Sequence, residues 1–195
     1  GEACRQARQW IETGDNSQRV AININLSARQ FQPETLEGEI ARALEENHLD
    51  PAQIGLEITE SVLMADADTT IEVLNSLKRL GVSLSVDDFG TGYSSLSSLK
   101  RFPVDALKID RSFVANIASA ENRAIVSSVV HLAHALDMTV IAEGIETFDQ
   151  LRQVRETACE YAQGFLFSRP LPSSDVPGLL KQRFALDDLA HDATA

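Results

Sequence analysis

Residues 83–96 read Ser-Leu-Ser-Val-Asp-Asp-Phe-Gly-Thr-Gly-Tyr-Ser-Ser-Leu, and the fold prediction depends on this stretch. A short alternating apolar segment runs into the adjacent carboxylates Asp87 and Asp88, and a Gly-x-Gly turn with hydroxyl residues follows. An acid pair at the end of a strand is typical of a ligand site, but Asp and Gly are also the commonest turn residues. Taken alone, the stretch is compatible with a functional site and with a simple turn.

Strand and helix patterns alternate outward from this stretch in both directions. We expect strands at residues 19–26, 54–59, 82–86, 105–109, 138–142 and 161–167. We expect helices at residues 2–11, 33–46, 95–100, 122–136, 148–154 and 173–184, together with one that Asp68 caps and Gly81 ends. We see no internal domain boundary in residues 1–185, and we expect residues 186–195 to form a flexible acidic tail. The alternation predicts an α/β fold with a parallel sheet, either doubly wound or closed as a barrel.

Polar residues at the ends of the six expected strands favour the barrel. They are Asn25, Glu57, Asp87 with Asp88, Lys108, Glu143 and Gln163. A TIM-type (β/α)8 barrel gathers its strand ends at one mouth, where the active site lies. The first strand is not followed by Gly-x-Gly-x-x-Gly, which weakens the dinucleotide-binding alternative. Because a complete barrel takes about 250 residues, we expect this chain to hold about six of the eight strands.

Charge and cysteine content narrow the class of protein. The net charge of −12 over 195 residues opposes binding to DNA or to an anionic membrane surface. Cys4 and Cys159 give no disulfide framework, which indicates a reducing, cytoplasmic setting. No apolar run reaches the roughly 18 to 20 residues of a membrane-spanning helix, so any membrane anchor would lie elsewhere in a parent protein.

The expected cluster of carboxylates needs cations to offset its negative charge. Four carboxylates at one mouth repel one another unless cations or shared protons lie between them: Glu57, Asp87, Asp88 and Glu143. Hard oxygen ligands select magnesium, manganese or calcium. Two such ions bridged by Asp87, with Asn25 as a neutral ligand, could activate water against a phosphodiester. Lys108 either polarises that water or forms a salt bridge that balances the acids, and spacing alone leaves both roles open.

Six segments carry a family pattern in order along nearly the whole chain. They are Asn25-Leu26-Ser27-Ala28-Arg29-Gln30-Phe31, Leu56-Glu57-Ile58-Thr59-Glu60, residues 87–96, Leu107-Lys108-Ile109-Asp110, Ala142-Glu143-Gly144-Ile145-Glu146, and Gln163-Gly164 with Arg169-Pro170-Leu171. Together they resemble the EAL domain. That family hydrolyses the bacterial second messenger cyclic di-GMP to linear pGpG on a (β/α)8 barrel.

The resemblance implies a role for each matching residue. Metal ligands for two Mg²⁺ or Mn²⁺ ions would be Asn25, Glu57, Asp87, Asp88 and Glu143, with Asp87 bridging. Lys108 would position the nucleophilic water, with Glu143 and Asp87 as its catalytic partners. Substrate contacts would come from Gln163, Asp88 and Gly164. Residues that couple the mobile loop to the metal site and to a homodimer interface would be Glu60, Phe89, Gly90, Thr91, Gly92, Tyr93, Ser94 and Glu146.

One departure limits the resemblance. The Glu-Ala-Leu signature, whose Glu is a metal ligand in the family, does not occur near Gly1. We expect the chain to lack two opening strands, that ligand and a substrate-binding Arg, so that it is either truncated or completed by a strand-swapped partner. It should then be weakly active or inactive, as a cytoplasmic part of a bacterial protein with upstream sensory or cyclase domains. The alternative is a non-catalytic module that binds cyclic di-GMP or dimerises.

Overall fold

The computed structural model describes residues 1–13, 21–92 and 96–181, and it divides the chain into two compact units. The first unit covers residues 1–105 and the second begins at Ala106. The expected flexible tail lies outside the described residues. No helix within the described ranges combines the length and the apolar character that crossing a membrane requires.

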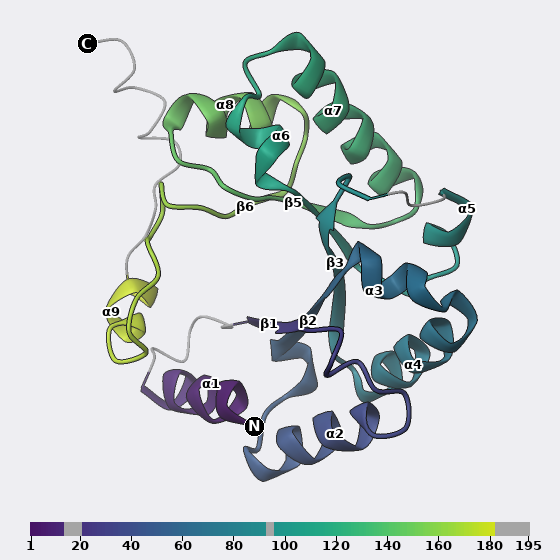
Figure 1. Cartoon of the computed structure of the whole chain (residues 1–195). Helices are drawn as coiled ribbons and strands as arrows, with labels where there is room; N and C mark the ends of the chain where they lie inside the picture. Colours follow the sequence, from purple (N-terminus) through teal and green to yellow (C-terminus); the bar gives the residue numbers. More distant parts are fainter. Residues whose placement is uncertain (14–20, 93–95, 182–195) are drawn as a thin grey trace. The chain divides into compact units, whose positions relative to one another are not determined.

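The first unit is built on three parallel strands with helices between them (Figure 1). Its elements are α1 (Glu2–Thr13), β1 (Ile22–Leu26), α2 (Leu36–Glu46), η1 (Pro51–Gln53), β2 (Ile54–Thr59), α3 (Glu60–Ala65), α4 (Ala67–Leu80), β3 (Ser83–Phe89) and α5 (Leu96–Leu99). Strand β2 pairs in parallel with β1 and with β3. Helix α3 packs on β2 and β3, and α4 packs on α2 and β3. These contacts bury one face of β2 and β3.

The second unit repeats the arrangement. Its elements are β4 (Ala106–Ile109), α6 (Arg111–Ala115), α7 (Ala120–Ala135), β5 (Thr139–Ala142), α8 (Phe148–Glu156), β6 (Tyr161–Ala162) and α9 (Val176–Leu180). Strand β5 pairs in parallel with β4 and with β6, and α7 packs on β4 and β5. Parallel strands joined by helices confirm the α/β class. The six described strands are those that we expected of the incomplete barrel.

Side chains alternate along the strands of the first unit. Leu56, Ile58, Leu84 and Val86 point to the helix side and are almost completely buried. The residues between them point to the other side and are polar or lack a side chain: Asn23, Asn25, Gly55, Glu57, Thr59, Ser83, Ser85 and Asp87. Since successive strand residues face opposite sides of a sheet, the apolar face carries the packing. The polar face therefore carries the side chains that can bind a ligand.

Several element boundaries differ from the sequence-based expectation. Helix α2 begins at Leu36 rather than at residue 33, because residues 33–35 form a turn. Asp66, not Asp68, caps α4, since its carboxylate accepts a hydrogen bond from the Thr69 backbone N–H. Strand β3 extends to Phe89 and therefore includes the acid pair. Strand β6 covers two residues rather than seven, and the sequence analysis missed the short helices α3 and α6.

An acidic side chain fixes the start of β3. The carboxylate of Asp105 accepts a hydrogen bond from the Leu84 backbone N–H at 2.8 Å and from Lys78 Nζ at 2.7 and 2.8 Å. The Asp105 backbone N–H in turn donates to the Leu84 carbonyl. Asp105 thus ties the last turns of α4 to the first residues of β3, at the opposite end of that strand from the acid pair.

We expect Asp105→Ala to lower the free energy of unfolding by about 1–3 kcal/mol, because it leaves the Leu84 N–H without its acceptor. Lys78→Met should cost less than about 1 kcal/mol, because the ion pair that it removes is partly exposed. Urea unfolding of both variants would test this difference. Equal losses would show that the ion pair, rather than the backbone bond, fixes the start of β3.

A second acidic side chain, Glu160, links three segments of the second unit. One carboxylate oxygen accepts a hydrogen bond from the Val140 backbone N–H at 2.9 Å, and the other lies 2.6 Å from His134 Nε2. Burial, the largest single influence, raises the pKa of Glu160, but hydrogen bonds from backbone groups and from His134 outweigh it. The pKa therefore lies below its ordinary value, and His134 has a structural role in the unit.

A lowered pKa in the folded state predicts the direction of the pH effect. The stability that Glu160 contributes is complete above its unfolded pKa near 4.5 and is lost as the pH falls through the lower folded value. Glu160→Gln should therefore reduce the loss of unfolding free energy between pH 6 and pH 3. Urea titrations at both pH values test this, with Glu156→Gln on the exposed face of α8 as the matched control. An identical loss in the unaltered chain and in Glu160→Gln would contradict the assignment.

Candidate functional site

Two of the expected ligands lie side by side in the first unit. Asn25 on β1 is directly opposite Glu57 on β2 in the parallel register, and both belong to the polar face. Paired strands lie about 4.8 Å apart, so the two side chains can share one ligand. Glu57 is only 5% exposed, whereas Asn25 is exposed. A carboxylate buried to this degree needs hydrogen-bond donors or a cation around it.

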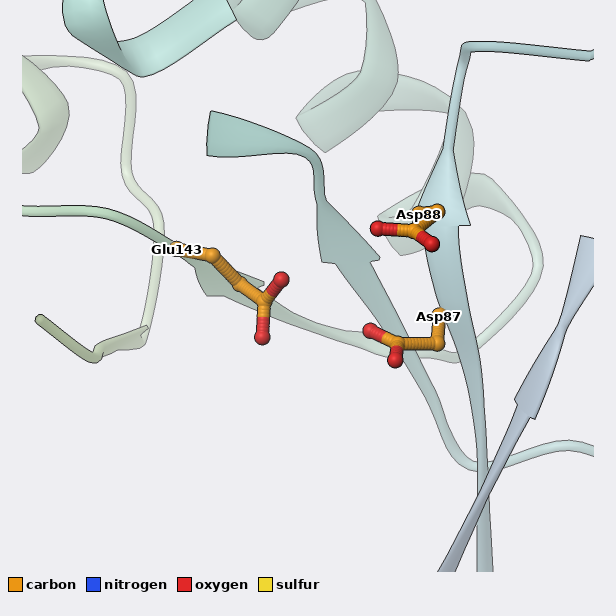
Figure 2. Close-up of side chains that lie close together, drawn as sticks. All are labelled: Asp87, Asp88 and Glu143. Atoms are coloured by element: carbon orange, nitrogen blue, oxygen red, sulfur yellow. The ribbon is translucent and has the colours of Figure 1, made fainter. Parts of the chain in front are cut away.

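The acid pair Asp87 and Asp88 lies on β3, beyond the level of Asn25 and Glu57, and it departs from regular strand geometry. Asp87 is opposite Thr59, two residues beyond the Glu57 level. Asp88 has a φ of +53°, in the left-handed region that Asp tolerates better than most residues. This backbone turn interrupts the alternation, and Figure 2 shows both carboxylates on the same side of β3. The sequence pattern did not predict this conformation, for which the nearby glycines were the only signal.

Lys108 and Glu143 form an ion pair in the second unit. Lys108 lies on β4 with 2% of its surface exposed, and its Nζ is 2.7 Å from Glu143 Oε1. Glu143, also drawn in Figure 2, directly follows β5, and its backbone N–H donates to the Ile109 carbonyl. The salt bridge that the sequence left open for Lys108 is therefore present. A buried ammonium beside a carboxylate is also suitably placed to donate hydrogen bonds to an anionic reactant.

The end of β6 presents Gln163 and Gly164. The Gln163 backbone N–H donates to the Ala142 carbonyl, and its own carbonyl accepts from the Ile145 N–H. A Cβ on Gly164 would overlap the Ile145 backbone, so any side chain at this position must displace main chain. Glu146 follows as an exposed residue whose N–H donates to the Gln150 side chain, next to the capping box that begins α8.

Glu60, the first residue of α3, reaches the loop after β3. It is 4% exposed, and its Oε2 accepts a hydrogen bond from the Gly90 backbone N–H at 3.2 Å. Its Oε1 is buried and accepts no hydrogen bond from the described residues. A Cβ on Gly92 would lie 2.5 Å from that oxygen, so this glycine leaves room for the carboxylate. Tyr93 and Ser94, which we assigned to the same loop, lie outside the described residues.

The polar residues of the first unit have donor groups that fit a divalent cation. These groups are the amide oxygen of Asn25 and the carboxylates of Glu57, Asp87 and Asp88. None of these four residues is histidine or cysteine, and hard oxygen donors of this kind suit Mg²⁺, Mn²⁺ or Ca²⁺. Parallel strands with acids at their carboxyl ends define a class of α/β folds in which the strand ends carry the functional residues.

Within that class, the chain belongs to the EAL domain family, whose model matches residues 1–170. It is 43% identical over 176 residues to the bifunctional diguanylate cyclase/cyclic di-GMP phosphodiesterase MucR of Pseudomonas aeruginosa, covering 90% of this chain and 25% of MucR. It is 46% identical over 180 residues to the cyclic di-GMP phosphodiesterase NbdA of the same organism, covering 92% of this chain and 23% of NbdA. The chain thus spans about a quarter of the length of these relatives.

Solved structures give the same fold. The structure of the MucR phosphodiesterase in complex with cyclic di-GMP matches with a TM-score of 0.84 at 43% identity, over 90% of this chain and 70% of that one. A manganese and cyclic di-GMP complex of BlrP1 from Klebsiella pneumoniae matches with a TM-score of 0.77 at 35% identity, over 88% of this chain and 43% of BlrP1. A calcium complex of BlrP1 matches as well. Divalent ions therefore occur in structures of the family.

Gly164→Ala should destabilise the second unit by about 1–3 kcal/mol or more, because the added methyl group must displace the Ile145 backbone. Gly38→Ala makes the same chemical change inside α2, where nothing lies within 4 Å of the added Cβ. It should stabilise the chain by roughly 0.5–1 kcal/mol through helix propensity. Urea unfolding measures both, and a neutral Gly164→Ala would show that the Gln163 turn tolerates a side chain.

Proposed function

We propose that this chain is part of a phosphodiesterase that hydrolyses cyclic di-GMP to linear pGpG with divalent metal ions. The observation that carries the proposal is the acid pair Asp87 and Asp88 on β3. The neighbouring strand β2 presents Glu57, and β2 pairs in turn with β1, which presents Asn25 opposite Glu57. The names of MucR and NbdA support the substrate, because both are cyclic di-GMP phosphodiesterases.

The ions in this proposal are two Mg²⁺ or Mn²⁺. They would be held by Asn25, Glu57, Asp87, Asp88 and Glu143, with Asp87 as the ligand common to both. When bound, such ions lower the pKa of water and neutralise charge on a phosphodiester. Without cations these acids would repel the anionic substrate, as the net charge of −12 does over the whole chain.

Lys108 supplies the fixed positive charge. Because it is buried and paired with Glu143, its ammonium group is held in one position and needs no reorganisation when charge develops on the phosphate. From there Lys108 donates hydrogen bonds that orient the attacking water, while the Glu143 carboxylate holds the ammonium group in place. Asp87 and Glu143 are its partners at the reacting centre.

Substrate contacts and assembly complete the proposal. Gln163, Gly164 and Asp88 contact the dinucleotide, and Gly164 allows the chain to turn tightly beside it. Glu60, which bonds the Gly90 backbone, couples the loop of residues 89–94 to the metal site and to a homodimer interface, and Glu146 belongs to the same coupling set. We place the chain in the cytoplasm, within a longer protein that carries sensory or cyclase domains.

Asp87→Asn tests the proposal most directly. It keeps the size of the side chain and removes the shared negative ligand, so pGpG release in Mg²⁺ or Mn²⁺ should fall by at least 100-fold, or about 2.7 kcal/mol. Lys108→Met should lower kcat more than KM, since it removes an interaction that strengthens in the transition state. The measurement is chromatographic detection of pGpG from cyclic di-GMP, with this chain and with a chain extended upstream.

Asp149→Asn on α8 is the matched control. It makes the same chemical change in an exposed (i, i+3) ion pair with Arg152 and should leave pGpG release unchanged. Cyclic di-GMP binding without hydrolysis in both the chain and its extension would favour the alternative, a non-catalytic regulatory module. Turnover that survives Asp87→Asn would overturn the proposed metal chemistry.

A further inference from the structure

The polar face of the first unit continues below the expected ligands. There the Asn23 side chain occupies the space that a side chain at position 55 would take. Gly55 on β2 is opposite Asn23 on β1 and Ser83 on β3. A Cβ on Gly55 would overlap Asn23 Oδ1 and would lie 3.0 Å from Ser83 Oγ. The Asn23 amide therefore lies across the bare backbone of Gly55, in the space that a side chain of residue 55 would take.

This arrangement lies one level beneath the proposed metal ligands. Residues two apart on a strand share a face and are separated by about 6.6 Å along it. The level of Asn23, Gly55 and Ser83 is followed by the level of Asn25, Glu57 and Ser85. At this spacing an amide N–H on the lower level can reach the base of the Glu57 side chain through a single water.

We propose that Asn23 is a positioning residue for the metal ligands Glu57 and Asn25, and that Gly55 exists to admit its amide. The inference rests on the proposed metal site but not on the identity of the substrate. Glu57 is 5% exposed, so its carboxylate depends on the hydrogen-bond donors around it, and Asn23 adds a donor from the level below. Substitution of a group that hydrogen-bonds to a metal-ligating carboxylate typically weakens metal affinity by 10- to 100-fold.

Two single variants separate positioning from packing. Asn23→Ala removes the amide, whereas Gly55→Ala keeps it but pushes it aside, at low cost because Asn23 Oδ1 is the end of a flexible, exposed side chain. Each should raise the dissociation constant for Mn²⁺ about tenfold without a large change in the melting temperature. The double variant should bind Mn²⁺ no more weakly than Asn23→Ala, since both changes remove the same contribution.

Mn²⁺ titration followed by electron paramagnetic resonance, with a thermal melt of each metal-free variant, makes the measurement without substrate. Asn75→Ala, at an exposed position of α4, is the matched control and should leave the Mn²⁺ affinity unchanged. If Asn23→Ala does not fold, Asn23→Ser and Gly55→Ala serve in its place. An unchanged Mn²⁺ affinity in these variants would overturn the role of Asn23 and leave the proposed function intact. A failure of the unaltered chain to bind Mn²⁺ would overturn both.

Discussion

The division of each parallel strand into an apolar and a polar face is the constraint on which the first unit depends. Leu56, Ile58, Leu84 and Val86 bury one face under helices, and this burial holds β2 and β3 in place. Because the register is parallel and the side-chain period is two, the same pairing aligns every residue of the other face. A slip of one residue would bury Glu57 under a helix and expose Leu56, so packing and ligand placement cannot vary independently.

Charge imposes a second constraint. Buried carboxylates such as Glu57 are unfavourable unless donors, cations or an ammonium group surround them. The second unit meets this demand with Lys108 beside Glu143. The polar face of the first unit carries amides and hydroxyls beside its acids. The proposed metal ions would add positive charge there.

Sequence patterns were sufficient to predict the bounds of an element wherever one physical signal dominated. Strand 54–59 and the Gly81 cap of α4 were predicted to the residue, and Glu143 directly follows its strand as expected. Gln163 was expected inside a strand of residues 161–167, but it follows the shorter β6. The predictions were wrong where tertiary contacts, rather than local sequence patterns, determine the structure. Strand β6 is short because Ile145 and Leu166 form backbone bonds around Gly164 that no local pattern encodes. Asp66 and Asp68 are equally good caps in sequence, and the left-handed turn at Asp88 leaves no signature of its own.

Three glycines show why the remaining part of the site could not be read from sequence. The space where a Cβ would lie is filled by the Asn23 amide at Gly55, by the Glu60 carboxylate at Gly92 and by the Ile145 backbone at Gly164. In each case a group near a strand end presses against bare backbone. A sequence shows that the side chain is absent but not which distant group takes its volume. Glycines on the polar face are therefore informative only when the structure supplies the neighbour, and at Gly55 that neighbour is an amide directly below the proposed metal ligands.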